Sequence, residues 1–213
     1  MDRDAVVARY RHLRRIVKVH KAAALAHLSE QAVLDQARFL RVAAGKTILT
    51  HTDEERTLVI DLALHAPRHA RSRAFERYRN VVKLPADSDE ARMLDALCAA
   101  RFVIGAIEGL HDVAGLVATD LLRGTELWLM DMNLEASMSE TFVFAGHLIT
   151  LDGFWMTTGA IAPVERADVE DALDHLPPAR GGTPEAVADD PLFAGLVCRA
   201  ALARGAMDQI MMM

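Results

Sequence analysis

The chain is poor in cysteine and has no long apolar run, and these two absences exclude several classes of protein. Its two cysteines, Cys98 and Cys198, lie in apolar surroundings and form no CxxC or Cys/His spacing. A disulfide framework is therefore excluded, a zinc knuckle is disfavoured, and a reducing compartment with buried thiols is indicated. No window reaches the roughly 18 uninterrupted apolar residues that a membrane span requires.

The first fifteen residues, MDRDAVVARYRHLRR, are charged and contain no apolar stretch of the kind found in a secretion signal. We therefore expect neither export nor membrane anchoring, and we predict a cytoplasmic protein. A length of 213 residues is enough for one or two domains with a full core.

The common catalytic motifs are absent as well. The sequence has no GxGxxG after a strand, no GxxxxGK[ST] and no GxSxG, and no histidine accompanies either cysteine in a recognisable motif. His147 stands alone among apolar residues in the strand-like segment FVFAGHLITL, which favours a structural, hydrogen-bonded histidine. We therefore expect no cofactor and a protein that binds rather than catalyses.

Charge is distributed unevenly along the chain. Residues 1–83 carry 17 Lys and Arg against 9 Asp and Glu, a net charge of +8, whereas residues 84–213 carry 7 against 21, a net charge of −14. Such an asymmetry indicates either a basic surface for nucleic acid or an acidic partner, or two parts that attract each other within the fold or in an oligomer.

Apolar periodicity predicts a helical first half and a β-rich second half. Apolar residues recur every three or four positions over residues 2–45, which predicts a helical hairpin with Ser29 as an N-cap and Gly45 as a stop. Two more helices are expected over 72–82 and 87–101. Runs rich in Val, Ile, Phe, Thr and Trp then predict strands over 102–110, 113–119, 125–132, 141–151 and 154–162, with a type I′ turn at Asp152-Gly153.

These elements predict an α+β fold with a helical N-terminal part, a small antiparallel sheet or half-open barrel, and a C-terminal helix. We divide the chain into a helical, basic region (1–101), an antiparallel β region (102–164) and a last region (165–213) of helix, linker and C-terminal helix. The linker is suggested by PPARGGTPEAVADD, and the last helix, starting at Asp190-Pro191, either docks back or reaches a neighbouring subunit.

The segment HTDEERTLVIDLALH, residues 51–65, has two interpretations. Thr52 and Glu55 have the spacing of a capping box, and His65 in the last turn is favoured when partly cationic, so an ordinary helix accounts for the pattern. Alternatively, Asp61 and His65 are spaced by four residues and ligate a metal ion for assisted hydrolysis, with His51 or His69 as a third ligand.

Basic residues on two helices support a second alternative, nucleic-acid binding. Phe75 and Tyr78 are interleaved with some of them, and basic residues with aromatics suit phosphate neutralisation and base stacking. The candidate contact residues are Arg9, Arg11, Arg14, Arg15, Lys18, Arg71, Arg73, Arg77 and Arg79.

The order of elements over residues 51–164 resembles that of uncharacterised bacterial proteins often joined to a SEC-C motif. The residues that carry the resemblance are DEERTLVIDLALH, RSRAFERYR, DSDEARMLDALCAARF, GLVATDLLRGTELWLMD and HLITLDGFWMTTGAIAPV. The resemblance implies an α+β cytoplasmic protein of bacteria. Zinc binding does not carry over, because this chain has no C-terminal cysteine cluster.

The sequence as a whole leads us to expect an uncharacterised, non-enzymatic protein that binds a protein partner or itself as a homo-oligomer. The opposed charges of the two parts, the last helix and the missing catalytic motifs motivate this hypothesis. Nucleic-acid binding and metal-assisted hydrolysis at Asp61 and His65 remain open beside it.

Overall fold

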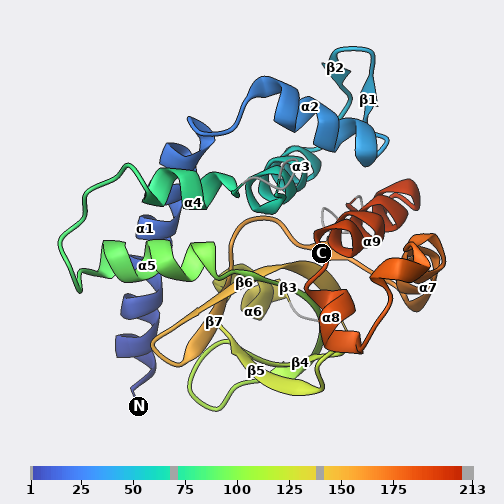
Figure 1. The fold of residues 1–213 in the computed structure, drawn as a ribbon. Coiled ribbons are helices and arrows are strands. Elements are labelled where there is room, and N and C mark those ends of the chain that lie inside the picture. The colour runs from blue at the N-terminus through green and yellow to red at the C-terminus, as the bar shows by residue number, and fades with distance from the viewer. Residues whose placement is uncertain (1, 68–71, 138–141, 208–213) are drawn as a thin grey trace.

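The computed structural model describes residues 2–67, 72–137 and 142–207, and it shows the predicted α+β fold. In Figure 1 the strands of the six-stranded sheet gather in the lower half of the view, with helices α3 (Asp53–His65) and α9 (Pro191–Ala203) above them and α1 (Arg3–Leu25) alongside. Helices α1 and α3 and strand β6 (Val143–Leu151) come from different parts of the chain and are brought into proximity by the fold.

The predicted N-terminal hairpin is confirmed. Helix α1 spans Arg3–Leu25, and α2 spans Glu30–Phe39 with the Ser29 side chain accepting a hydrogen bond from the Ala32 backbone N–H. The second helix ends earlier than expected. Gly45, with a φ of 61°, instead lies in the turn between two short paired strands, β1 (Ala43–Ala44) and β2 (Thr47–Ile48).

The next three helices also match the predictions, with shorter bounds. Helix α3 spans Asp53–His65, α4 spans Ala74–Arg79, and α5 spans Asp89–Cys98. At the start of α3, the Thr52 hydroxyl accepts from the Glu55 N–H at 3.1 Å and the Glu55 carboxylate accepts from the His51 N–H at 2.6 Å. The capping box predicted from Thr52 and Glu55 is therefore confirmed.

The strands form a small barrel. They are β3 (Arg101–Leu110), β4 (Leu116–Asp120), β5 (Thr125–Leu129), β6 (Val143–Leu151), β7 (Phe154–Thr157) and β8 (Ala162–Pro163). The first five pair in the order β3-β4-β5-β7-β6, and β6 pairs back onto β3, so the ring closes. Pairing is antiparallel except between β5 and β7, which are parallel. Asp152 and Gly153 both have positive φ, as the predicted turn between β6 and β7 requires.

Side chains of β3 and β6 alternate between the inside of the barrel and the helices. Phe144 and Leu148 of β6 belong to the cluster inside the barrel, whereas Ala145 and Ile149 pack with the helices. His147 has the same parity as Ala145 and Ile149, so it faces the helices. This alternation brings His147 toward α3.

Two predicted strands end early, for different reasons. After β5, the Asp131 carboxylate accepts hydrogen bonds from the Asn133 and Leu134 N–H groups and starts a short helix, α6 (Met132–Ser137). The strand expected over 154–162 breaks after Thr157, because Thr158 turns to bond Lys21 and Asp61. Thr141, the first residue of another expected strand, lies outside the described residues.

The C-terminal segment packs onto the rest of the chain. It contains α7 (Arg166–His175), a 3-10 turn (Pro178–Arg180), α8 (Pro184–Ala188) and α9 (Pro191–Ala203). Val187 and Ala188 are buried within the segment expected to be a linker. Helix α9 contacts α3, α7, β6 and β8, so it docks back on the chain. Within the residues described, no helix is long and apolar enough to cross a membrane.

The packing of α9 gives a first prediction. Phe193 is fully buried and lies edge-to-face against Phe102, with ring centroids 6.5 Å apart. Phe193→Ala should lower the free energy of unfolding by about 3–5 kcal/mol in urea denaturation, because it removes a buried ring and leaves a cavity. Leu173→Ala, at a side chain that is 45% exposed, is the matched control and should change it by about 0.5 kcal/mol or less. Equal effects would mean that α9 is not part of the core.

Candidate functional site

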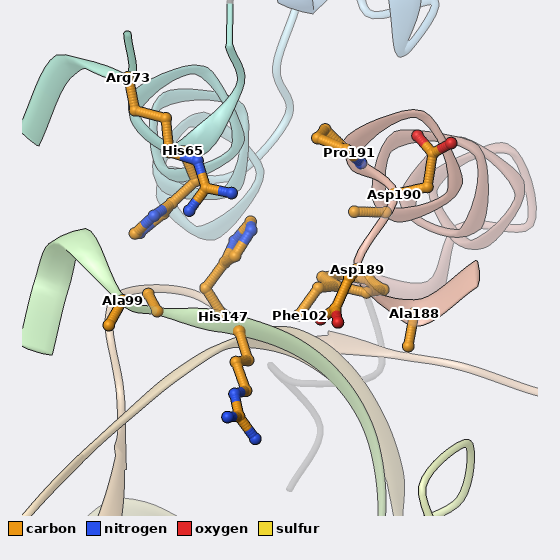
Figure 2. Close-up of a pocket in the computed structure, with 12 residues that line it drawn as sticks. His65, Arg73, Ala99, Phe102, His147, Ala188, Asp189, Asp190 and Pro191 are labelled. Carbon is orange, nitrogen blue, oxygen red and sulfur yellow. The ribbon is translucent and has the colours of Figure 1, made fainter. Parts of the chain in front are cut away.

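Asp61, His65 and His147 meet where α3 crosses the helix-facing side of β6. Asp61 and His65 share one face of α3 because they are four residues apart. One ligand atom from each of the three side chains lies within 4.8 Å of the others, and all three residues are buried. Figure 2 shows the rings of His65 and His147 next to each other.

Asp61 is held by groups from two other segments. The Lys21 ammonium of α1 donates to Asp61 Oδ1 at 2.8 Å and to the Thr158 carbonyl at 2.9 Å. The Thr158 hydroxyl lies 3.0 Å from both carboxylate oxygens. Gly159 makes room for this pair, since a Cβ there would meet Lys21 Nζ and would lie 2.6 Å from Asp61 Oδ1. The carboxylate is therefore fixed in position.

The surroundings of Asp61 favour its charged form. Burial alone raises the pKa of a carboxyl group, but the positive charge of Lys21 and the contact with His147 outweigh it, and the pKa of Asp61 lies far below its usual range. Asp61 Oδ2 lies 3.3 Å from His147 Nδ1, which is ion-pair distance without the angle of a hydrogen bond.

His65 is held between two rings. It stacks on His147 with centroids 4.1 Å apart and lies 5.0 Å from the Phe75 ring. Burial, and then the neighbouring His147, lower its pKa well below the ordinary histidine value. The expectation of a partly cationic His65 at the helix end is therefore wrong, because the ring is buried and not exposed to solvent beside the last turn.

Both ring nitrogens of His65 and Nδ1 of His147 are buried and accept or donate no hydrogen bond within the described part of the chain. A buried polar group without a partner costs about 1–3 kcal/mol. Folded proteins satisfy most such groups, so an exception needs a specific cause, for which a bound ion and a catalytic role are two recognised examples.

A cavity of about 210 Å³ gives access to the two histidines and is partly open to solvent. It lies between β3, α4 and the start of α9, and Figure 2 shows side chains from these elements around it. Its polar lining comes from His65, Arg73, Arg101, His147, Asp189 and Asp190. A ligand in this cavity would lie beside the histidine pair.

The third ligand suggested from the sequence is replaced by a different residue. His51 is exposed and precedes α3, about 20 Å of helix away from His65. His69 lies outside the described residues. His147 was interpreted from the sequence as a lone structural histidine. No local sequence pattern pairs it with Asp61, because the pairing depends on which side of β6 faces the helices.

Most of the basic residues proposed for nucleic acid make contacts within the protein. Arg9 pairs with Asp89 and Asp152, Arg14 donates to Thr157, Arg77 to the His27 carbonyl, and Arg79 pairs with Asp95. Arg73 lines the cavity, and Arg71 lies outside the described residues. Arg11, Arg15 and Lys18 border a shallow surface hollow on α1 and form no ion pair with a described residue.

The opposite charges of the two parts of the chain meet in the fold. Arg3 of α1 pairs with Glu135, and Arg9 pairs with both Asp89 and Asp152. Arg92 adds a second cation to Asp152 at 2.6 Å. The interpretation that the two parts attract each other is therefore confirmed for these residues, and α1 is the main basic partner.

These contacts predict different roles for two arginines of α1. Arg9→Ala should lower the free energy of unfolding by about 1 kcal/mol, because it removes one of the two arginines that pair with both the Asp89 and Asp152 carboxylates and leaves them only Arg92 as a shared cation. Arg15→Ala, on a different face of α1, should change the free energy of unfolding by less than about 0.5 kcal/mol. Urea denaturation of both variants at low salt measures the difference, and equal values would show that the Arg9 network contributes nothing.

The depressed pKa of His65 predicts a pH dependence for the metal-free protein. A histidine that stays neutral in the folded state takes up its proton only on unfolding. Above about pH 6.5 the ring is neutral in both states, and the free energy of unfolding does not depend on it. Below that pH the free energy of unfolding falls by up to about 1.4 kcal/mol per pH unit. The depressed pKa of Asp61 acts in a lower window, below about pH 4.

Urea denaturation in the presence of a chelator between pH 7.5 and 4.5 separates these two groups. His65→Gln should show a shallower loss of stability than the wild type over this range. His175→Gln, at an exposed histidine of α7, should keep the wild-type slope. A His65→Gln profile parallel to the wild type would contradict a neutral, buried His65.

Comparison with known proteins places the chain in a family. Neither the curated proteins nor the solved structures contain a match to it. The resemblance to proteins joined to a SEC-C motif stays a prediction. A model described as a family of unknown function, DUF7986, matches residues 4–175, and the chain therefore belongs to this family.

Proposed function

We propose that Asp61, His65 and His147 bind a divalent transition-metal ion of the zinc type, and that the site serves metal-assisted hydrolysis. The observation that carries the proposal is the set of buried imidazole nitrogens that lack a hydrogen-bond partner beside an ionised carboxylate, among the residues described. A metal ion would satisfy Nδ1 of His147 and one of the two ring nitrogens of His65.

The ligand chemistry fits such an ion. Two imidazoles and one carboxylate are common zinc ligands, and three protein ligands are typical of catalytic rather than structural sites. Metal ions bind neutral imidazole, and the lowered pKa of His65 keeps its ring in that form at neutral pH. Asp61 is ionised under the same conditions.

The spacing of the ligand atoms is close to what a metal ion requires. Ligands about 2.0–2.2 Å from a tetrahedral zinc lie about 3.5 Å from one another. Asp61 Oδ2 and His147 Nδ1 are 3.3 Å apart, and the widest separation in the set is within 4.8 Å. Binding would draw the side chains together by about 1 Å.

The surroundings would support the ion and give it access to a substrate. Lys21 binds Asp61 Oδ1, the Thr158 hydroxyl lies 3.0 Å from both oxygens, and Oδ2 lies 3.3 Å from His147 Nδ1; such outer contacts tune ligand orientation. A zinc ion with three protein ligands keeps one position for water and lowers the pKa of that water, which supplies a nucleophile for hydrolysis. The cavity reaches both histidines.

The two other hypotheses receive less support. Binding of a protein partner or of a second copy was motivated by the opposed charges, the last helix and the missing catalytic motifs. Several of the opposed charges pair within the chain, and α9 packs on α3 and the barrel. Nucleic-acid binding keeps Arg11, Arg15 and Lys18 as candidate contact residues. Both hypotheses remain predictions. The unsatisfied buried atoms among the described residues support the metal site and neither of these hypotheses.

Metal binding is tested on the untagged protein after chelation and dialysis. Titration with Zn²⁺ by calorimetry, and with Co²⁺ by its visible absorption, should give one ion per chain. His65→Gln and His147→Gln should each weaken binding at least 10-fold, because each removes a ligand. His51→Gln is the matched control: it changes an exposed histidine next to the same helix and should leave the affinity unchanged.

Two results would overturn the proposal. One is a wild-type protein that takes up neither ion, and the other is a histidine series in which His51→Gln weakens binding as much as His65→Gln. Hydrolysis is then assayed with the zinc-loaded protein on p-nitrophenyl phosphate and p-nitrophenyl acetate. Turnover that is lost in His147→Gln and retained in His51→Gln would support hydrolytic chemistry at this site.

A further inference from the structure

The acidic side chains around the cavity form ion pairs within the protein, whereas its arginines form none with a described residue. Its two acidic residues already have cationic partners: Asp189 pairs with Arg123 at 2.6 Å, and Asp190 pairs with Arg180 at 2.8 Å. Asp190 also caps α9 by accepting from the Leu192 N–H. The negative charge at the cavity is therefore balanced by the protein itself.

The two arginines that line the cavity, Arg73 and Arg101, do not have their charges neutralised in the same way. The Arg73 guanidinium donates to the Cys98 carbonyl at 3.4 Å, and neither Arg73 nor Arg101 pairs with a carboxylate of a described residue. Figure 2 shows the Arg73 side chain extending from the start of α4 toward the rings of His65 and His147. The cavity thus presents uncompensated positive charge next to the histidine pair.

We propose that the cavity binds the phosphate group of a small phosphomonoester, with Arg73 and Arg101 holding its oxygens beside His65 and His147. Guanidinium groups bind phosphate oxygens through paired N–H donors of matching geometry. Two such groups balance a phosphate dianion, whereas a carboxylate needs only one. The cavity of about 210 Å³ lies below the roughly 300–1,000 Å³ of drug-sized sites, which indicates a small ligand.

This inference rests on the proposed function for the reaction, and names its substrate class. In hydrolysis of a phosphomonoester, water forms the new bond to phosphorus and the bond between phosphorus and the ester oxygen breaks. The released alcohol takes one proton of the water, and inorganic phosphate keeps the other. The arginines would hold the phosphate group, and the metal site would lie next to it.

Phosphate binding is measured first without metal, so that it does not depend on the proposed function. Inorganic phosphate is titrated into the chelated full-length protein at low ionic strength, followed by calorimetry and ³¹P NMR line width. The wild type should bind one phosphate. Arg73→Gln and Arg101→Gln should each weaken binding about 10-fold or more, and the double variant should show none.

The controls separate a binding role from a structural one. Arg166→Gln changes an arginine that is exposed on α7 and should bind phosphate like the wild type. Arg101 is exposed, so its replacement should leave the thermal unfolding midpoint unchanged while phosphate affinity falls. A parallel titration with acetate should show weaker binding than phosphate.

The outcomes distinguish this inference from the metal proposal. Failure of the wild type to bind phosphate, with or without zinc, or full affinity in the double variant, would overturn it even if zinc binds. Tighter binding of acetate would overturn the choice of phosphate. If phosphate binds through both arginines and zinc does not bind, the phosphate site stands and the metal-assisted reaction falls.

Discussion

The ion pair between Lys21 and Asp61 is the contact on which the candidate site depends. It joins α1 to α3, and the same ammonium holds the Thr158 carbonyl where the chain leaves β7. A buried carboxylate without its cation is strongly destabilising, so Asp61 keeps its place only while α1 supplies Lys21. The position of the histidine pair follows from this, because Asp61 lies one helical turn from His65 and in contact with His147. The basic first helix thus supplies the cation that holds the buried carboxylate of the candidate site.

Local sequence patterns predicted most of the secondary structure. Ser29 and Thr52 cap helices as expected, and Asp152-Gly153 turns between β6 and β7, because each of these features depends on a few neighbouring residues. The pattern also indicated a small barrel. The parallel pairing of β5 with β7 could not be read in the same way, since it joins strands that a helix and a third strand separate in the chain.

Two of the three residues of the site could be paired from the sequence. Asp61 and His65 are visible as a pair because the helical repeat brings residues four apart onto one face. His147 is 82 positions beyond His65, and its approach depends on how β6 packs against α3, which no local pattern reports. Burial also reversed the expected ionisation of His65, and pairing across the fold removed Arg9 and Arg14 from the predicted nucleic-acid surface. Charge read along a sequence does not distinguish an internal partner from an external one.

The closed ring of strands limits how a partner could meet this protein. Because β6 returns to pair with β3, and β7 joins β5 at Leu129 and Trp155, each described barrel strand has a neighbour on both sides and none presents a whole open edge. The remaining outer strand, β8, is two residues long and includes Pro163, which has no N–H to donate. Recognition by adding a strand to an open sheet edge is therefore disfavoured here, and contacts with other molecules would form through side chains and helix faces.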